Sequence, residues 1–171
     1  GDGLREVLGQ MGDDLVVLEA PSANAFPSEL IWTGDRLKNG RIVDADGDGS
    51  PEILATRGGS TLVVIRAAGD NAFEEAGSLR NDTPGLNFLT RSRVVGDIDG
   101  NGSREILVGD ADGNLVAFRW DGVELRQVWD TRTAFNVVLD VAAGVFLGKR
   151  AIVVMGEEPF GLTPRGGAMA T

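Results

Sequence analysis

The chain contains three copies of one short pattern, in which a glutamate and a pair of apolar residues are followed by a turn and a second apolar run. The glutamates are Glu6, Glu52 and Glu105, which lie 46 and 53 residues apart. The second apolar runs occupy residues 15–18, 62–65 and 115–118. A pattern that recurs about every 40–50 residues constrains the fold strongly, because each copy must bury its apolar face against its neighbours.

The copies are predicted to consist of β-strands. Their apolar runs are short, rich in Val and Ile, and bounded by turn signals such as Gly58-Gly59 and Asp112-Gly113. No stretch keeps the 3.6-residue apolar period over the length that a helix needs. The second run of each copy is apolar on both faces, which predicts a central strand. Further strands are expected at residues 30–33, 74–79 and 123–129, with a degenerate fourth copy at 151–154.

Short strands repeated in series at this spacing are typical of β-propeller blades. We expect an all-β fold, with about three and a half four-stranded β-propeller blades in a single propeller region. The repeats are expected at about 1–40, 41–92, 93–136 and 137–171. Gly1-Asp2-Gly3 aligns with the middle of a loop, and fewer than four blades do not close a ring. The chain is therefore expected to be part of a larger propeller, or of one that a second subunit completes.

The composition excludes several kinds of chemistry. The chain has no Cys and no His, which excludes zinc sites built from thiolate or imidazole, Ser-His-Asp triads and histidine bases. Its 26 acidic residues exceed its 16 basic ones, and the net charge of −10 disfavours binding to nucleic acid. The longest apolar run, residues 137–147, contains Asp140 and is too short to span a bilayer, so no membrane insertion is expected.

Two loops, each directly before the first strand of a copy, carry the strongest chemical signal. The first reads Asp44-Ala-Asp46-Gly-Asp48-Gly-Ser50-Pro-Glu52, and the second reads Asp97-Ile-Asp99-Gly-Asn101-Gly-Ser103-Arg-Glu105. Oxygen-bearing residues stand at loop positions 1, 3, 5 and 9, and glycine stands at positions 4 and 6. Ca²⁺ takes about six to eight oxygen ligands, and alternate side chains on a tightly curled backbone can converge on one ion. Glycine at position 6 permits the turn that brings the backbone carbonyl of position 7 to the ion.

Ten residues are therefore predicted to bind two Ca²⁺ ions. They are Asp44, Asp46, Asp48, Ser50 and Glu52 in the first loop, and Asp97, Asp99, Asn101, Ser103 and Glu105 in the second. The first loop is expected to bind more tightly, because it has four carboxylates and the second has three. Two ions add four positive charges, which changes the net charge from −10 to −6. The alternative is that both loops are Asx turns without a metal, since Asp, Asn and Gly are common turn residues.

An EF-hand begins with a similar Asp-x-Asp-x-Asp-Gly run, but it needs a Glu at position 12 and flanking helices. Position 12 is Ala55 in the first loop and Val108 in the second, and both flanks are strand-like. The loops resemble instead the FG-GAP (VCBS-like) repeat of integrin α-subunit propellers and bacterial surface proteins. The resemblance implies calcium bound between the outer strands of a propeller blade, with Glu52 and Glu105 in place of Asp at position 9.

The remaining copies are degenerate at the ligand positions. The N-terminal copy keeps Asp2 and Glu6. The last copy, which is expected to bind no metal, has Asp140, Ala142, Gly144 and Ala151 where ligands would stand. Arg104, which directly precedes Glu105, is predicted to be a solvated strand residue.

The loops and the resemblance together predict a non-catalytic, calcium-binding propeller module for adhesion, ligand binding or assembly outside the cytoplasm. It would be secreted, periplasmic or at the cell surface, with a protein or a glycan as its ligand. No enzymatic activity is expected, because the concentrated carboxylates belong to the metal loops. Two alternatives stay open: a propeller-scaffold enzyme that acts on polysaccharide, and a structural subunit of a larger complex.

Overall fold

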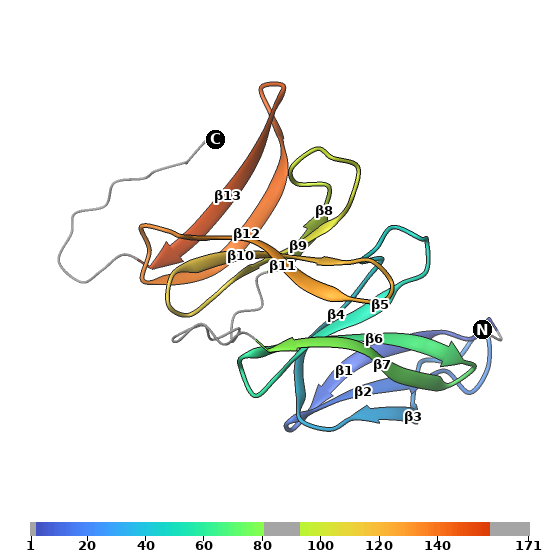
Figure 1. Cartoon of the computed structure of the whole chain (residues 1–171). Helices are drawn as coiled ribbons and strands as arrows, with labels where there is room; N and C mark the ends of the chain where they lie inside the picture. Colours follow the sequence, from blue (N-terminus) through green and yellow to red (C-terminus); the bar gives the residue numbers. More distant parts are fainter. Residues whose placement is uncertain (1–2, 81–92, 158–171) are drawn as a thin grey trace. The chain divides into compact units, whose positions relative to one another are not determined.

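The computed structural model describes residues 3–80 and 93–157, and these residues form antiparallel sheets without any helix (Figure 1). The predicted all-β fold is confirmed. Among the described residues no helix is long and apolar enough to cross a membrane. Asp2 and the predicted repeat boundaries at 92 and 171 lie outside the described residues.

The described residues divide into two compact units. The first unit comprises residues 3–43 and 51–80, and the second comprises residues 44–50 and 93–157. The first loop (residues 44–50) thus belongs to the second unit, although the strands on either side of it belong to the first.

The first unit contains two sheets. The three-stranded sheet has the order β1-β2-β3, with β1 (Glu6–Met11), β2 (Asp14–Glu19) and β3 (Glu29–Gly34). The four-stranded sheet has the order β4-β5-β6-β7, with β4 (Leu37–Val43), β5 (Glu52–Arg57), β6 (Thr61–Gly69) and β7 (Ala72–Arg80). The apolar runs of β2 and β6 are central, as predicted, and each pairs with a strand on both sides. Their inward side chains form one core with β4 and β5: Leu15, Val17, Leu37, Ile53, Ala55, Val63 and Ile65.

The second unit also contains two sheets. The four-stranded sheet has the order β11-β10-β9-β8, with β8 (Arg93–Gly96), β9 (Glu105–Gly109), β10 (Asn114–Trp120) and β11 (Leu125–Arg132). The last copy forms a two-stranded sheet of β12 (Val137–Phe146) and β13 (Lys149–Glu157). The central strand is again the apolar run, in β10. A second core joins the two sheets through Leu107, Leu115, Ala117, Val138 and Val141.

The last copy differs from the layout that its alignment suggested. Asp140, Ala142 and Gly144 lie inside β12 instead of in a loop, and the chain reverses at Leu147 and Gly148. These two residues have φ values of 50° and 75°, and two successive positive φ values are typical of a two-residue hairpin turn. The strands therefore pair almost up to the turn, which leaves no loop of the length that the first two loops have.

A buried carboxylate closes the turn between β9 and β10. Asp110 is fully buried, and its Oδ1 accepts the backbone N–H groups of Asp112 at 2.9 Å and Asn114 at 2.7 Å. Its Oδ2 accepts the Asn114 side-chain amide at 2.8 Å. Three hydrogen bonds thus converge on this buried carboxylate from partly buried donors, and removing it would cost part of the desolvation of each donor, so this turn depends on the Asp110 side chain.

Replacing Asp110 tests that dependence. Asp110→Ala is expected to lower the free energy of unfolding by about 1–3 kcal/mol, because it leaves partly buried N–H groups without their acceptor. Asp110→Asn keeps an oxygen for the two backbone donors and should cost less. Chemical denaturation of the two variants and the parent chain measures the difference. A loss within about 0.5 kcal/mol for Asp110→Ala, the range of ordinary surface substitutions, would contradict this account.

Candidate metal centre

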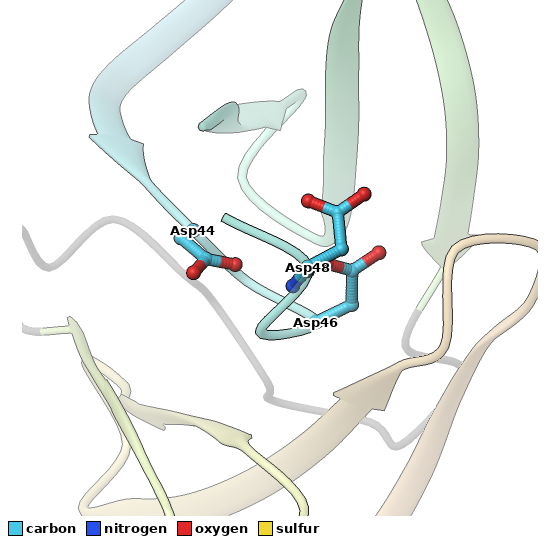
Figure 2. A group of neighbouring side chains, drawn as sticks. All are labelled: Asp44, Asp46 and Asp48. Carbon is cyan, nitrogen blue, oxygen red and sulfur yellow. Dashed lines mark hydrogen bonds between the residues drawn. The ribbon is translucent and has the colours of Figure 1, made fainter. Parts of the chain in front are cut away.

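The first loop brings three carboxylates together. Oxygen atoms of Asp44, Asp46 and Asp48 lie within 4.8 Å of one another. Figure 2 shows Asp46 and Asp48 extending from one side of the loop and Asp44 from the other. Gly47 and Gly49 have φ values of 90° and 92°, a region that side-chain-bearing residues rarely adopt, so glycine permits this curl.

Backbone hydrogen bonds orient these side chains. Oδ1 of Asp44 accepts the N–H of Gly47 at 2.7 Å, and Oδ1 of Asp46 accepts the N–H of Asp48 at 3.1 Å. Oδ1 of Asp48 accepts the N–H of Ser50 at 2.6 Å. Asx-type turns are therefore present, and each turn uses Oδ1 of its aspartate.

The second loop repeats this geometry between β8 and β9. Asp97, Asp99 and Glu105 place carboxylate oxygens within 4.8 Å of one another. The N–H of Gly100 donates to Oδ1 of Asp97 at 2.7 Å, and the N–H of Asn101 donates to Oδ1 of Asp99 at 3.0 Å. The glycines at positions 4 and 6 again have positive φ values, 88° and 90°. Two loops of different sequence thus adopt one backbone design.

The spacing of the oxygen atoms fits a single calcium ion. Calcium–oxygen distances are about 2.3–2.6 Å, so two ligands on opposite sides of one ion lie about 5 Å apart. Three carboxylate oxygens within 4.8 Å of one another are therefore close enough for small side-chain adjustments to bring all three to one ion. Carboxylates are also the hard ligands that Ca²⁺ prefers. Asp44, Asp46 and Asp48 would hold an ion in the first loop, and Asp97, Asp99 and Glu105 would hold one in the second.

The other four predicted ligands are placed differently. Glu52 is buried at the start of β5, in the first unit, where it pairs with Val43 of β4. Ser50 and Ser103 follow the positive-φ glycines and donate their N–H groups to the residue at position 5. Asn101 donates its side-chain amide to Oδ2 of Asp99 at 2.7 Å, so its nitrogen faces the carboxylates, and its oxygen accepts the N–H of Ser103.

Arginines contact position 1 of each loop, a role that the sequence did not predict. Arg104 donates to the backbone carbonyl of Asp44 at 2.6 Å and lies 3.2 Å from its Oδ2. Arg150 donates to the carbonyl of Asp97 and lies 3.3 Å from its Oδ2. In the repeat alignment Arg150 precedes Ala151 as Arg104 precedes Glu105. The prediction that Arg104 is only a solvated strand residue is wrong, because it contacts a loop 60 residues earlier in the chain.

A third arginine enters the second loop. Arg119 of β10 donates from Nη2 to Oε1 of Glu105 at 2.5 Å and from Nε at 3.2 Å, and it lies 3.6 Å from Oδ2 of Asp99. The other Glu105 oxygen, Oε2, accepts the N–H of Ile98 at 2.9 Å. The hydrogen bond to Glu105 raises the pKa of the Arg119 guanidinium above its ordinary value.

Glycine substitutions separate the role of the backbone from the role of the arginine. A Cβ at Gly100 would lie 2.8 Å from Nε of Arg150, whereas a Cβ at Gly102 would meet nothing within 4 Å. Both residues have φ near 90°, so both alanine variants should lose about 1–3 kcal/mol from backbone strain. Gly100→Ala is expected to lose more than Gly102→Ala in urea unfolding, because the Arg150 side chain must move. Equal losses would show that the Arg150 contact does not constrain position 4.

A comparison with known protein families identifies the segment that contains both loops as a repeat of known type. Residues 44–108 match the family model of the FG-GAP-like repeat. The match begins at the first ligand position of the first loop, includes the second loop and ends within β9. The predicted family resemblance is confirmed for this segment. No curated protein matches the chain.

Proposed function

Because residues 44–108 carry an FG-GAP-like repeat, we propose that the chain is a calcium-binding β-propeller module without catalytic activity. In this proposal the four sheets are successive blades of a single propeller region, which further blades or a second subunit complete. The module serves adhesion, ligand binding or assembly outside the cytoplasm, and it recognises a protein or a glycan.

One observation carries the calcium proposal. Two glycine-curled loops in successive copies, each directly before a strand, gather three carboxylates: positions 1, 3 and 5 in the first loop, and positions 1 and 3 with the first strand residue, Glu105, in the second. Asx turns alone do not need acidic side chains at these positions, since Asn and Ser form such turns without charge. Gathering three negative charges within 4.8 Å costs free energy, which the neighbouring arginines offset in part and a bound cation would offset further.

The proposed role of the ion is structural. Bound Ca²⁺ supplies positive charge and oxygen coordination at the loop. The chain's own residues fix the arrangement that receives it: the glycines curl the backbone, and the turn hydrogen bonds orient the aspartates. An ion that binds only the folded chain stabilises that state by mass action. The ion would thereby stabilise the curled conformation of each loop.

Two further arguments support the proposed location outside the cytoplasm and the absence of catalytic activity. Extracellular calcium modules have dissociation constants of about 10⁻⁴–10⁻³ M and need the abundant calcium of that compartment. Among the described residues, the two loops contain the groups of three or more acidic side chains that lie close together. Both groups are assigned to metal binding, which favours a binding module over an acid–base enzyme.

Thermal unfolding in EDTA and in about 1 mM Ca²⁺ tests the proposal. At a dissociation constant of about 10⁻⁴ M, each ion adds about 1.4 kcal/mol. For a chain of this size two ions should raise Tm by roughly 5–10 °C. Asp46→Asn combined with Asp99→Asn should abolish most of the shift, because asparagine keeps the turn oxygen Oδ1 but removes the charge.

Asp35→Asn is the matched control, because Asp35 is an exposed carboxylate outside both groups. This variant should keep the full calcium-dependent shift. A chain that unfolds at one temperature in both EDTA and calcium would make the loops plain turns. That result would also remove the reason for placing the protein outside the cytoplasm.

A further inference from the structure

Among the described residues, Arg119 is a basic group that contacts the second loop beyond position 1. Position 1 is contacted by an arginine in both loops, Arg104 in the first and Arg150 in the second, so these arginines do not distinguish them. Arg119 contacts the second loop at two further carboxylates, Glu105 and Asp99. We propose that Arg119 is a built-in counter-ion of the second loop, which competes with calcium there and makes this loop the weaker site. The inference rests on the proposed calcium function.

The side chain of Arg119 is bound to carboxylate oxygens that a calcium ion would need as ligands. Its guanidinium donates two hydrogen bonds to Oε1 of Glu105, whose side chain is 4% exposed. Ile98 donates to Oε2 of the same carboxylate. A carboxylate has about four lone-pair sites, and three of those on Glu105 are therefore taken. A calcium ion that uses Glu105 must displace at least part of the Arg119 contact.

The first copy with a complete loop has an arginine at the same register position, but its partner differs. In the first of these copies Ile65 of β6 pairs with Ile53 of β5. In the second copy Phe118 of β10 pairs with Ile106 of β9 in the same way. The residues that follow Ile65 and Phe118, Arg66 and Arg119, therefore correspond. Arg66 donates to Glu74 on the neighbouring strand β7, with its Nη2 2.7 Å from Oε1. Its side chain is 54% exposed, against 20% for Arg119.

A single charge reversal explains the different partners. Arg66 is paired in register with Glu74, whereas Arg119 is paired in register with Arg126. A like charge directly across the strand pair is unfavourable, and an opposite charge is favourable. At this position β11 therefore offers Arg119 no acidic partner. Arg119 contacts instead the second-loop carboxylates Glu105 and Asp99. Arg126 itself lies 4.0 Å from Asp121.

Calcium titration of separated loops tests the inference. In the full chain, Asp46→Asn disables the first loop and leaves the second to be measured by isothermal titration calorimetry. Adding Arg119→Met to this background is expected to tighten calcium binding about tenfold, which corresponds to about 1.4 kcal/mol. Methionine keeps much of the apolar stem and removes the competing charge. In EDTA the same change should lower Tm, since Glu105 loses its partner, and calcium should restore it.

Arg66→Met in an Asp99→Asn background is the matched control for the first loop. It should leave the calcium affinity unchanged, because Arg66 pairs with Glu74. Arg119→Gln is a second variant that still donates one hydrogen bond to Glu105, and it should also tighten calcium binding in the second loop. It keeps the test valid if Arg119→Met does not fold.

The possible failures are distinguishable. Calcium binding at the first loop, with a second-loop affinity that Arg119→Met and Arg119→Gln leave unchanged or weaken, overturns the role of Arg119 and leaves the proposed function standing. Absence of calcium binding at both loops, in the parent chain and in the Arg119 variants, overturns the proposed function together with this inference.

Discussion

Like-charge repulsion within two short loops is the constraint to which the surrounding structure responds. Each loop holds three carboxylates within 4.8 Å, and like charges at this separation repel one another unless donors or positive charges lie close by. Backbone N–H groups supply the first donors, because glycines with positive φ turn them toward the side chains. Guanidinium groups from distant parts of the chain supply positive charge, and a calcium ion would add to it under the proposed function.

These arginines connect loop geometry to the pairing of strands. Arg104 and Arg150 contact residues 60 and 53 positions earlier in the chain, so the order of each loop depends on segments that the following copy supplies. Arg119 reaches its loop from near the end of a central strand, β10. A single residue on the neighbouring strand, glutamate in one copy and arginine in the other, determines which carboxylate the central arginine meets. Repeats of similar backbone can therefore hold loops of different charge balance.

Much of the strand architecture was predictable because it depends on local patterns. The apolar runs at 62–65 and 115–118 are central strands, since a strand covered on both faces must be apolar on both. Glu52 and Glu105 begin β5 and β9 as expected, because the turn of each loop ends directly before them. The prediction for the last copy was less accurate. Asp140 was aligned with the first position of a loop but lies within β12, because a two-residue turn replaces that loop. Side-chain spacing alone does not distinguish a shortened hairpin from a degenerate loop.

The sequence by itself determined the apolar strands that follow each loop, the two glycine-curled loops and the alternation of their acidic residues, because each depends on neighbours a few positions apart. It did not predict β4, β8 or β12. Only the tertiary structure decided how the loop charges are balanced. Arg104 and Arg150 are distant in sequence from the aspartates they contact, and Arg66 and Arg119 occupy equivalent positions yet have different partners. Charge pairing between segments depends on strand register and on which side chain lies opposite, and both are fixed only when the sheets form.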